Sequence, residues 1–339
     1  MKFVSFPLLM LAFAAGAVAE EELNIVATTS DLASIAQSVA GSHAVVRNVC
    51  KGDRDPHFLQ AKPGYIMMAR DADLWIRVGM ELEIGWEPAI LDGARNSAIR
   101  ENGPGHLDAS QSVLRLEVPA QRVTRAMGDV HAQGNPHYWL DPLNGRIVAK
   151  AIAGRLEQID PFNAASYRAN LAQFQKALDE RMFGTELVSQ IGGDKLWAIE
   201  LKGSLGEFLE KGNLAGKLGG WAAAVKPLRA QKIVTYHKSW VYFANRFGLA
   251  IDCELEPKPG IPPSPSHLAR VIERINGGGI RVILLEPFYS RKAADFVAGK
   301  TSATTVVCPN SVGGNDSATD YLSLIDTIVD RVSKAFTER

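Results

Sequence analysis

Three histidines of this sequence lie where an ordered segment meets a loop. His57 follows the strand-like segment "HAVVRNV" by a short loop, His137 precedes "YWLDP", and His237 directly follows the strand-like "KIVTY". In a parallel α/β sheet, ligands bind in the crevice outside the carboxyl ends of the strands. Imidazole nitrogens suit zinc and other first-row transition metals. We therefore interpret these side chains as candidate ligands of one metal ion.

Five further side chains bear on this interpretation. Glu286 ends the strand-like "IRVILLE", so it is expected to point toward the same crevice and is a candidate for a fourth ligand, as is water. His43 lies at a strand entry and His267 at a helix start, where both are expected to be surface or packing residues. His106 and His131 lie in a loop-rich stretch, which is typical of solvent-exposed side chains.

An enzyme is the main alternative at the level of residues. Three histidines and Glu286 would also form a hydrolytic zinc site with an open coordination position and a base. The sequence contains no HExxH motif and no nucleophile elbow to support this alternative. Turnover of a generic ester or peptide is the observation that separates the two.

The elements that must position these residues follow from hydrophobic periodicity. Strand-like apolar segments alternate with helical segments, both before and after a long helical stretch in the middle of the chain. This order predicts an α/β fold of two lobes, each with a parallel sheet flanked by helices. A single linking helix is expected where Tyr167, Leu171, Phe174 and Leu178 recur at spacings of four, three and four.

The predicted division of the chain is a signal peptide, a first lobe, the linking helix and a second lobe, at 1–19, 20–160, 161–191 and 192–339. Within the second lobe, "KLWAIEL" is interpreted as a strand. The glycine-rich stretch Gly192–Trp221 has no clear periodicity, and the sequence offers no account of it.

The first residues and the composition indicate an exported, soluble protein. One basic residue precedes an apolar segment that ends in Ala17-Val18-Ala19, the pattern of a signal peptide with its cleavage site. No cysteine follows closely, so we expect a periplasmic protein without a lipid anchor. Lys+Arg and Asp+Glu both number 37, which argues against a nucleic-acid partner. We expect a monomer, and whether Cys253 pairs with Cys308 stays open.

Four of these segments together resemble one known family. "DPHFLQAKP", "NPHYWLDPLNG", "VTYHKSWVYFANRFGL" and "ILLEPFYS" resemble, in the same order, motifs of the solute-binding proteins of zinc and manganese ABC transporters, the cluster A-I group. The resemblance covers nearly the whole chain after the signal peptide. It implies two α/β lobes joined by a rigid helix, a metal ion between them, and ligand roles for His57, His137 and His237.

The resemblance also implies a function and a cargo. The protein would capture a divalent metal and deliver it to an ABC permease and its ATPase in the inner membrane. His237 occupies a slot that is a glutamate in manganese-type relatives, so zinc is favoured over manganese or iron. Because the ligand histidines must be neutral, metal affinity is expected to fall below about pH 6. An adhesin role, described for some members, is disfavoured without a lipid-anchor cysteine.

The sequence departs from the family pattern at two places. In "VVCPNSVGG", Asn310 stands where relatives often have an aspartate ligand, so the fourth position is left to Glu286, Asn310, water or nothing. Many zinc-type relatives also have a His-rich acidic loop before the second ligand, and here only Asp129 and His131 remain of it.

Residues around the motifs have expected supporting roles. Asp141 is expected to cap the helix after "YWLDP". Asp55 is expected either to cap the turn before Pro56 or to orient a ligand imidazole. The aromatic side chains nearby are expected to pack around the crevice and keep it dry; they are Phe58, Trp139, Trp240 and Tyr242.

Overall fold

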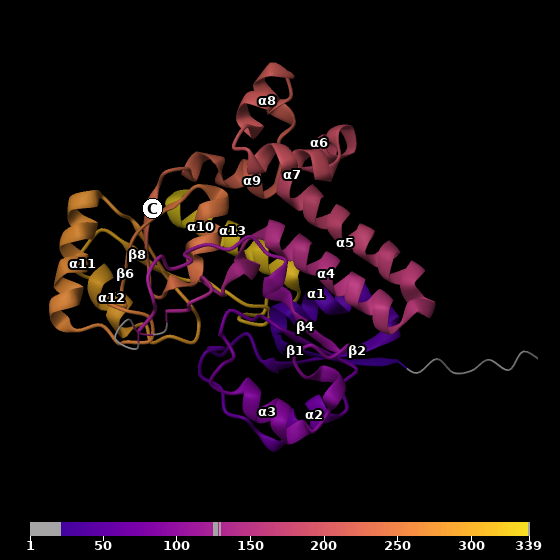
Figure 1. Cartoon of the computed structure of the whole chain (residues 1–339). Coiled ribbons are helices and arrows are strands. Elements are labelled where there is room, and N and C mark those ends of the chain that lie inside the picture. The colour runs from indigo at the N-terminus through magenta and orange to yellow at the C-terminus, as the bar shows by residue number, and fades with distance from the viewer. Residues whose placement is uncertain (1–21, 125–127, 129, 338–339) are drawn as a thin grey trace, which may run out of the picture.

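The structure is a computed structural model that describes residues 22–124, 128 and 130–337. The predicted signal peptide over 1–19 therefore lies outside the described residues. The described chain forms two four-stranded parallel sheets, each covered by helices on both faces (Figure 1). This confirms the predicted fold class.

The first sheet has the strand order β2-β1-β3-β4. Its strands are β1 Leu23–Thr29, β2 Ala44–Cys50, β3 Leu74–Arg77 and β4 His106–Asp108. Side chains alternate along β1: Ile25 and Ala27 pack toward helices α1 and α4, whereas Val26 packs toward α2 and α3. The helices are α1 Ser30–Ala40, α2 Pro63–Arg70, α3 Glu87–Ala94 and α4 Pro142–Ile159. Burial on both faces explains why the strand reads as a continuous apolar segment.

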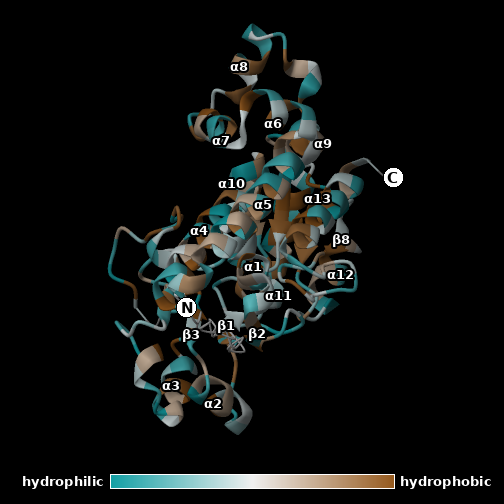
Figure 2. Cartoon of the chain, turned by 90° about the vertical axis from the view of Figure 1, so that its right-hand side faces the viewer, coloured by the Kyte–Doolittle hydropathy of each residue, from teal (hydrophilic) through white to brown (hydrophobic). Residues whose placement is uncertain are grey.

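The second sheet repeats this plan with the order β6-β5-β7-β8. Its strands are β5 Lys232–Thr235, β6 Ala250–Glu254, β7 Val282–Leu285 and β8 Thr304–Val307. Its helices are α10 Val241–Phe247, α11 Pro265–Gly278, α12 Lys292–Ala298 and α13 Tyr321–Thr337. Figure 2 shows apolar strands of this sheet in brown behind the helices. Ile233 packs with α10 and α13, and Val234 packs with α11 and α12.

The helix expected over 161–191 is two helices in the structure. A short 3-10 turn at Pro161–Asn163 leads into α5 Ala164–Phe183, and α6 Thr185–Ile191 follows a break. The break is at Gly184, whose φ of 90° is a left-handed conformation that favours glycine. A Cβ there would also lie 2.9 Å from the Gly219 backbone. The rest of the predicted division of the chain stays a prediction.

The segment "KLWAIEL" is helical, so its interpretation as a strand is wrong. It belongs to α7 Gly193–Leu201, which is followed by α8 Leu205–Lys211 and α9 Gly220–Val225. Trp197 fixes this helix, because its ring lies 4.9 Å from that of Phe183 and its Nε1 donates to Asp179 at 2.6 Å. Helices α6 to α8 project from the body of the protein (Figure 1).

The two lobes touch near the start of α1. The Ser30 hydroxyl donates to the Val312 carbonyl at 2.7 Å, and the Val312 N–H donates to Asp31 at 2.9 Å. Gly52 lies so close that a Cβ would stand 2.0 Å from the same carbonyl oxygen. A side chain at position 52 would therefore separate the lobes at this point.

Two remaining observations concern bonds and membranes. Cys253 and Cys308 are both free thiols in the structure, so they do not pair. Across 22–124, 128 and 130–337, no helix has both the length and the apolar character needed to span a bilayer.

Candidate metal site

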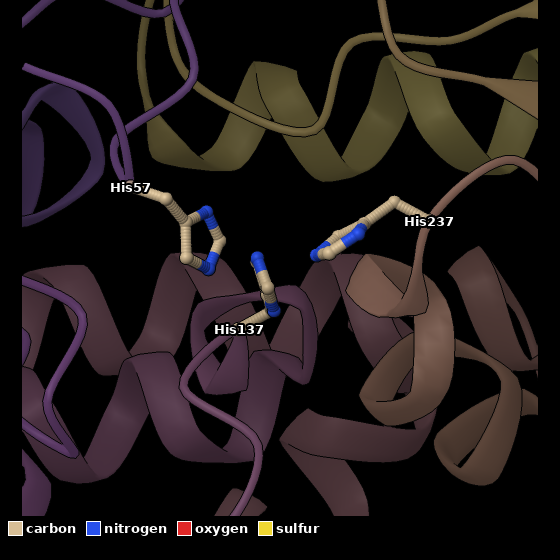
Figure 3. Close-up of side chains that lie close together, drawn as sticks. All are labelled: His57, His137 and His237. Atoms are coloured by element: carbon tan, nitrogen blue, oxygen red, sulfur yellow. The ribbon is translucent and has the colours of Figure 1, made fainter. Parts of the chain in front are cut away.

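The three predicted histidines converge on one point between the lobes (Figure 3). One nitrogen of each ring lies within 4.8 Å of the other two. The ring centroids are 5.2 Å apart for His57 and His137, and 5.4 Å apart for each of the two pairs that include His237. Tetrahedral zinc with bonds of about 2.0–2.1 Å needs ligand nitrogens about 3.4 Å apart, so a small contraction would suffice.

Strand ends and a helix start position the three rings. His237 stands two residues beyond β5, and His57 follows the end of β2 after a six-residue loop. His137 precedes a 3-10 turn, Tyr138–Leu140, that leads into α4. His137 and His237 are 2% and 4% exposed, and the His57 side chain is 7% exposed. The rings are thus held in a largely dry crevice.

Each ring is oriented by an acceptor on its Nδ1. These acceptors are Asp55 Oδ1 for His57 at 2.7 Å, Asn135 Oδ1 for His137 at 2.9 Å, and Glu256 Oε2 for His237 at 2.7 Å. Because the acceptors take the Nδ1 proton, the Nε2 lone pair of each ring remains free for a ligand. Metal-binding histidines have this arrangement in general.

Asp55 contacts both the backbone and the ring of His57. Its Oδ1 accepts from the His57 backbone N–H at 3.0 Å as well as from the ring. Its Oδ2 accepts from the hydroxyl of Tyr289, which comes from the other lobe, at 3.1 Å. The carboxylate therefore links His57 of the first lobe to Tyr289 of the second lobe.

Sequence reasoning missed Asn135 and Glu256. Asn135 stands two residues before His137, in "NPH", just as Asp55 stands two residues before His57 in "DPH". That repeated spacing was a usable signal. Glu256 lies nineteen residues from His237 and comes close only because β6 and β5 are neighbours in the sheet.

Electrostatics favour a neutral ring at His137. Burial lowers the pKa of His137 well below 6.5, and His57 and His237 act in the same direction. A proton on this ring would be buried beside two other imidazoles. His137 therefore keeps its lone pair at pH values where an exposed histidine would lose it.

The candidates for a fourth ligand do not join the group of three. In the part of the chain that the structure describes, no Glu, Asp or Cys atom lies within 4.8 Å of all three histidine nitrogens. Glu286 is fully buried at the end of β7, and Asn310 follows β8. Neither the Glu286 carboxyl oxygens nor Asn310 Oδ1 has a hydrogen bond of ordinary geometry to the described residues.

The buried carboxyl of Glu286 predicts a pH effect on stability. Burial raises its pKa to about 8 from 4.5. Between these values the unfolded chain is ionised and the folded chain is protonated, so folding stability falls as pH rises from about 4.5 to 8. In metal-free protein, Glu286→Gln should remove this loss, and its stability advantage should grow to the order of a few kcal/mol by pH 8.

Urea unfolding of both proteins at several pH values measures this advantage, with the exposed Glu273→Gln as the matched control. Parallel pH profiles for the parent and Glu286→Gln would contradict the burial argument.

The acceptor on His237 predicts an effect on metal affinity. Glu256→Gln removes the carboxylate that orients the His237 ring, so zinc affinity should fall about 10–100-fold. A competition titration against a chromophoric chelator measures the change. Glu273→Gln again serves as the control, because it removes an exposed charge far from the ring. Equal zinc affinities for both variants would show that the Glu256 contact does not contribute to zinc binding.

Several other side chains lie where sequence analysis did not expect them. His106 is 7% exposed and its Nδ1 contacts the Ile99 carbonyl at 2.8 Å, so the expectation of solvent exposure is wrong. His131 is half-buried, with its ring 5.4 Å from that of His57. His106 is the first residue of β4, inside the sheet, rather than part of a surface loop.

The aromatic residues divide into two groups. Trp139 and Trp240 are fully buried and Tyr242 is 1% exposed, as expected for side chains that pack near the crevice. Phe58 is 64% exposed, so its expected packing role is wrong.

Asp141 caps α4, as predicted. It accepts from the Leu143 N–H at 2.9 Å. It also forms a buried two-bond ion pair with Arg246, through Nε at 2.7 Å and a terminal nitrogen at 2.8 Å. Arg246 lies on α10, which follows His237 in the chain. The ion pair therefore connects α4, which follows His137, to the segment that carries His237.

Two matched α/β lobes with convergent side chains between them define a two-lobed binding protein. The family model described as zinc-uptake complex component A, periplasmic, matches residues 25–182 and 218–335. The chain belongs to this family. The match leaves out 183–217, which includes most of the stretch 192–221 that the sequence left unexplained.

Individual relatives are more distant. The iron-binding protein YfeA of Yersinia pestis is 26% identical over 322 residues, covering 93% of this chain and 87% of the relative. The high-affinity zinc uptake system protein ZnuA of Brucella abortus is 26% identical over 171 residues, covering 50% of this chain and 40% of the relative.

Solved structures confirm the fold. A crystal structure of ZnuA superimposes with a TM-score of 0.67 at 20% identity, covering 93% of this chain and 99% of that chain. A manganese-bound periplasmic metal-binding protein (S38A mutant) from Candidatus Liberibacter asiaticus gives 0.66 at 19% identity, with the same coverage. At this identity the likeness concerns the fold alone.

Proposed function

We propose that this protein captures one divalent transition-metal ion between its lobes and delivers it to an ABC importer. The observation that carries the proposal is the convergence of three imidazoles, each with its Nδ1 engaged and its Nε2 free. In this proposal His57, His137 and His237 are the metal ligands. Family membership supports the transport role.

Zinc is the proposed cargo. Three imidazole nitrogens suit zinc better than the harder manganese ion, which prefers oxygen ligands. The zinc uptake names of the matching family and of the Brucella relative support this choice. The iron-binding name of the Yersinia relative and the manganese-bound structure make these two metals the competitors to test.

The partners and location follow from the same role. The chain would be exported by the signal peptide over 1–19, act in the periplasm as a monomer, and dock on a permease that an ATPase drives. Relatives described as periplasmic or as substrate-binding lipoproteins support this location. In this role the metal is bound and released unchanged, so we propose that the site hydrolyses neither esters nor peptides.

Metal titration of the chelator-treated protein tests the proposal. We expect one equivalent of zinc to bind, a hundredfold excess of manganese or ferrous iron to leave it in place, and the zinc-loaded protein to leave a generic ester and peptide intact. Sub-stoichiometric zinc binding, displacement by manganese, or turnover of either substrate would each contradict it.

A further inference from the structure

His131 brings a fourth imidazole to the edge of the proposed site. Its ring centroid lies 5.4 Å from that of His57, at an interplanar angle of 35°. It lines the same pocket as His137 and His237, together with Asn135 and Lys238. Its Nε2 is buried and has no hydrogen-bond partner. A buried polar atom without a partner is uncommon and calls for an explanation.

The His131 ring lies beside the Met80 backbone. The Met80 backbone carbonyl lies within hydrogen-bonding reach of this ring. Nε2 has no partner among the described residues, so this nitrogen is open to a ligand. A metal-binding histidine commonly has its other ring nitrogen bound to a backbone carbonyl, and Met80 is placed to supply one here.

The loop around Met80 is held in one backbone conformation by several hydrogen bonds. Met80 and Glu81 both have positive φ, at 52° and 65°, which non-glycine residues rarely adopt. The buried Glu83 holds the turn, since its carboxyl accepts from the Val78 N–H at 2.7 Å and from the Gly79 N–H at 3.1 Å. A second contact fixes the histidine's own segment: the N–H of residue 132 donates to Glu81 at 2.9 Å.

We propose that His131 is the fourth ligand of the captured metal, through Nε2, and that its ring closes onto the ion when the ion binds. The closing movement is required because the nitrogen of His131 lies outside the group of three that are within 4.8 Å of one another. This inference rests on the proposed function of the site.

The proposed ligand set has a chemical consequence. Four imidazoles complete a tetrahedral zinc site without a carboxylate or water, so the oxygen-rich coordination that manganese prefers is absent. Glu286 and Asn310, both buried, then remain outside the coordination sphere. His131 therefore becomes a residue that determines the choice between zinc and manganese.

Alanine variants combined with zinc K-edge X-ray absorption test this assignment. In the zinc-loaded parent we expect four imidazole nitrogens around zinc. In His131→Ala we expect three nitrogens plus one water oxygen, and zinc affinity about tenfold lower or more. Glu286→Gln and Asn310→Ala should keep four imidazoles and parental affinity. His131→Glu should reduce the preference for zinc over manganese by a similar factor. His267→Ala, which removes a distant histidine, is the matched control.

The possible outcomes distinguish a failure of the His131 assignment from a failure of the proposed metal-binding function. If the parent binds one zinc through three imidazoles and His131→Ala has the same spectrum, the proposed function stands and the role of His131 is overturned. If His131→Ala weakens binding but keeps four imidazoles, the residue only shapes the pocket and the inference is again overturned. If the parent binds no zinc, the proposed function itself fails. Circular dichroism verifies that each variant is folded.

Discussion

Replacement of any one of His57, His137 and His237 by alanine is expected to weaken zinc binding about 100-fold or more. Structural zinc in small peptides is worth about 10–16 kcal/mol over four ligands, so each ligand accounts for roughly 3 kcal/mol. The buried His137, with its Nδ1 held by Asn135, should be the most sensitive, because water cannot readily reach the position it leaves. Isothermal titration calorimetry with a competing chelator measures each affinity.

His267→Ala is the matched control for these three variants. This histidine lies at the start of α11, and its Nε2 contacts the Glu254 carbonyl at 3.1 Å rather than the other rings. Its loss should leave zinc affinity unchanged. Parental affinity in two of the three ligand variants would show that the ion binds elsewhere.

Replacement of Arg246 by leucine is expected to destabilise the metal-free protein by about 3–5 kcal/mol, because it leaves the buried carboxylate of Asp141 without its partner. The side chains of this ion pair are only 7% and 4% exposed. Arg246 also lies over the Trp197 ring, 5.4 Å from its centroid. The substitution therefore removes a contact to α7 together with the charge pair. The free energy of unfolding in urea measures the loss.

Arg291→Leu provides the comparison for Arg246. It breaks an ion pair with Asp295 whose side chains are 56% and 49% exposed. Solvent screens such a pair, so we expect little change in stability. If the two variants lost equal stability, burial would not be what makes the Arg246 pair important.

The fold could be predicted wherever a local sequence pattern was enough to identify a strand or a helix. Buried parallel strands can be recognised in the sequence as short apolar segments, and the helices between them by their hydrophobic periodicity. The positions of His57 and His237 after strands then placed both at the crevice, because parallel strands end at the same edge. The pattern failed at "KLWAIEL", since a short apolar segment fits a buried helix as well as a strand.

What the sequence could not supply were contacts made only by tertiary packing. Glu256 contacts His237 across neighbouring strands, and no local sequence pattern at either residue indicates this contact. The break at Gly184 depends on the close approach of Gly219 from a distant segment. His131 was expected in solvent because its loop is polar, yet that loop folds back onto the residues around Met80.

A crystal structure of the zinc-loaded protein, with anomalous scattering recorded at the zinc edge, tests the central claim most directly. We expect one strong peak between the lobes, about 2.0–2.1 Å from Nε2 of His57, His137 and His237. A peak bound by one lobe alone, or at a surface histidine such as His267, would contradict it.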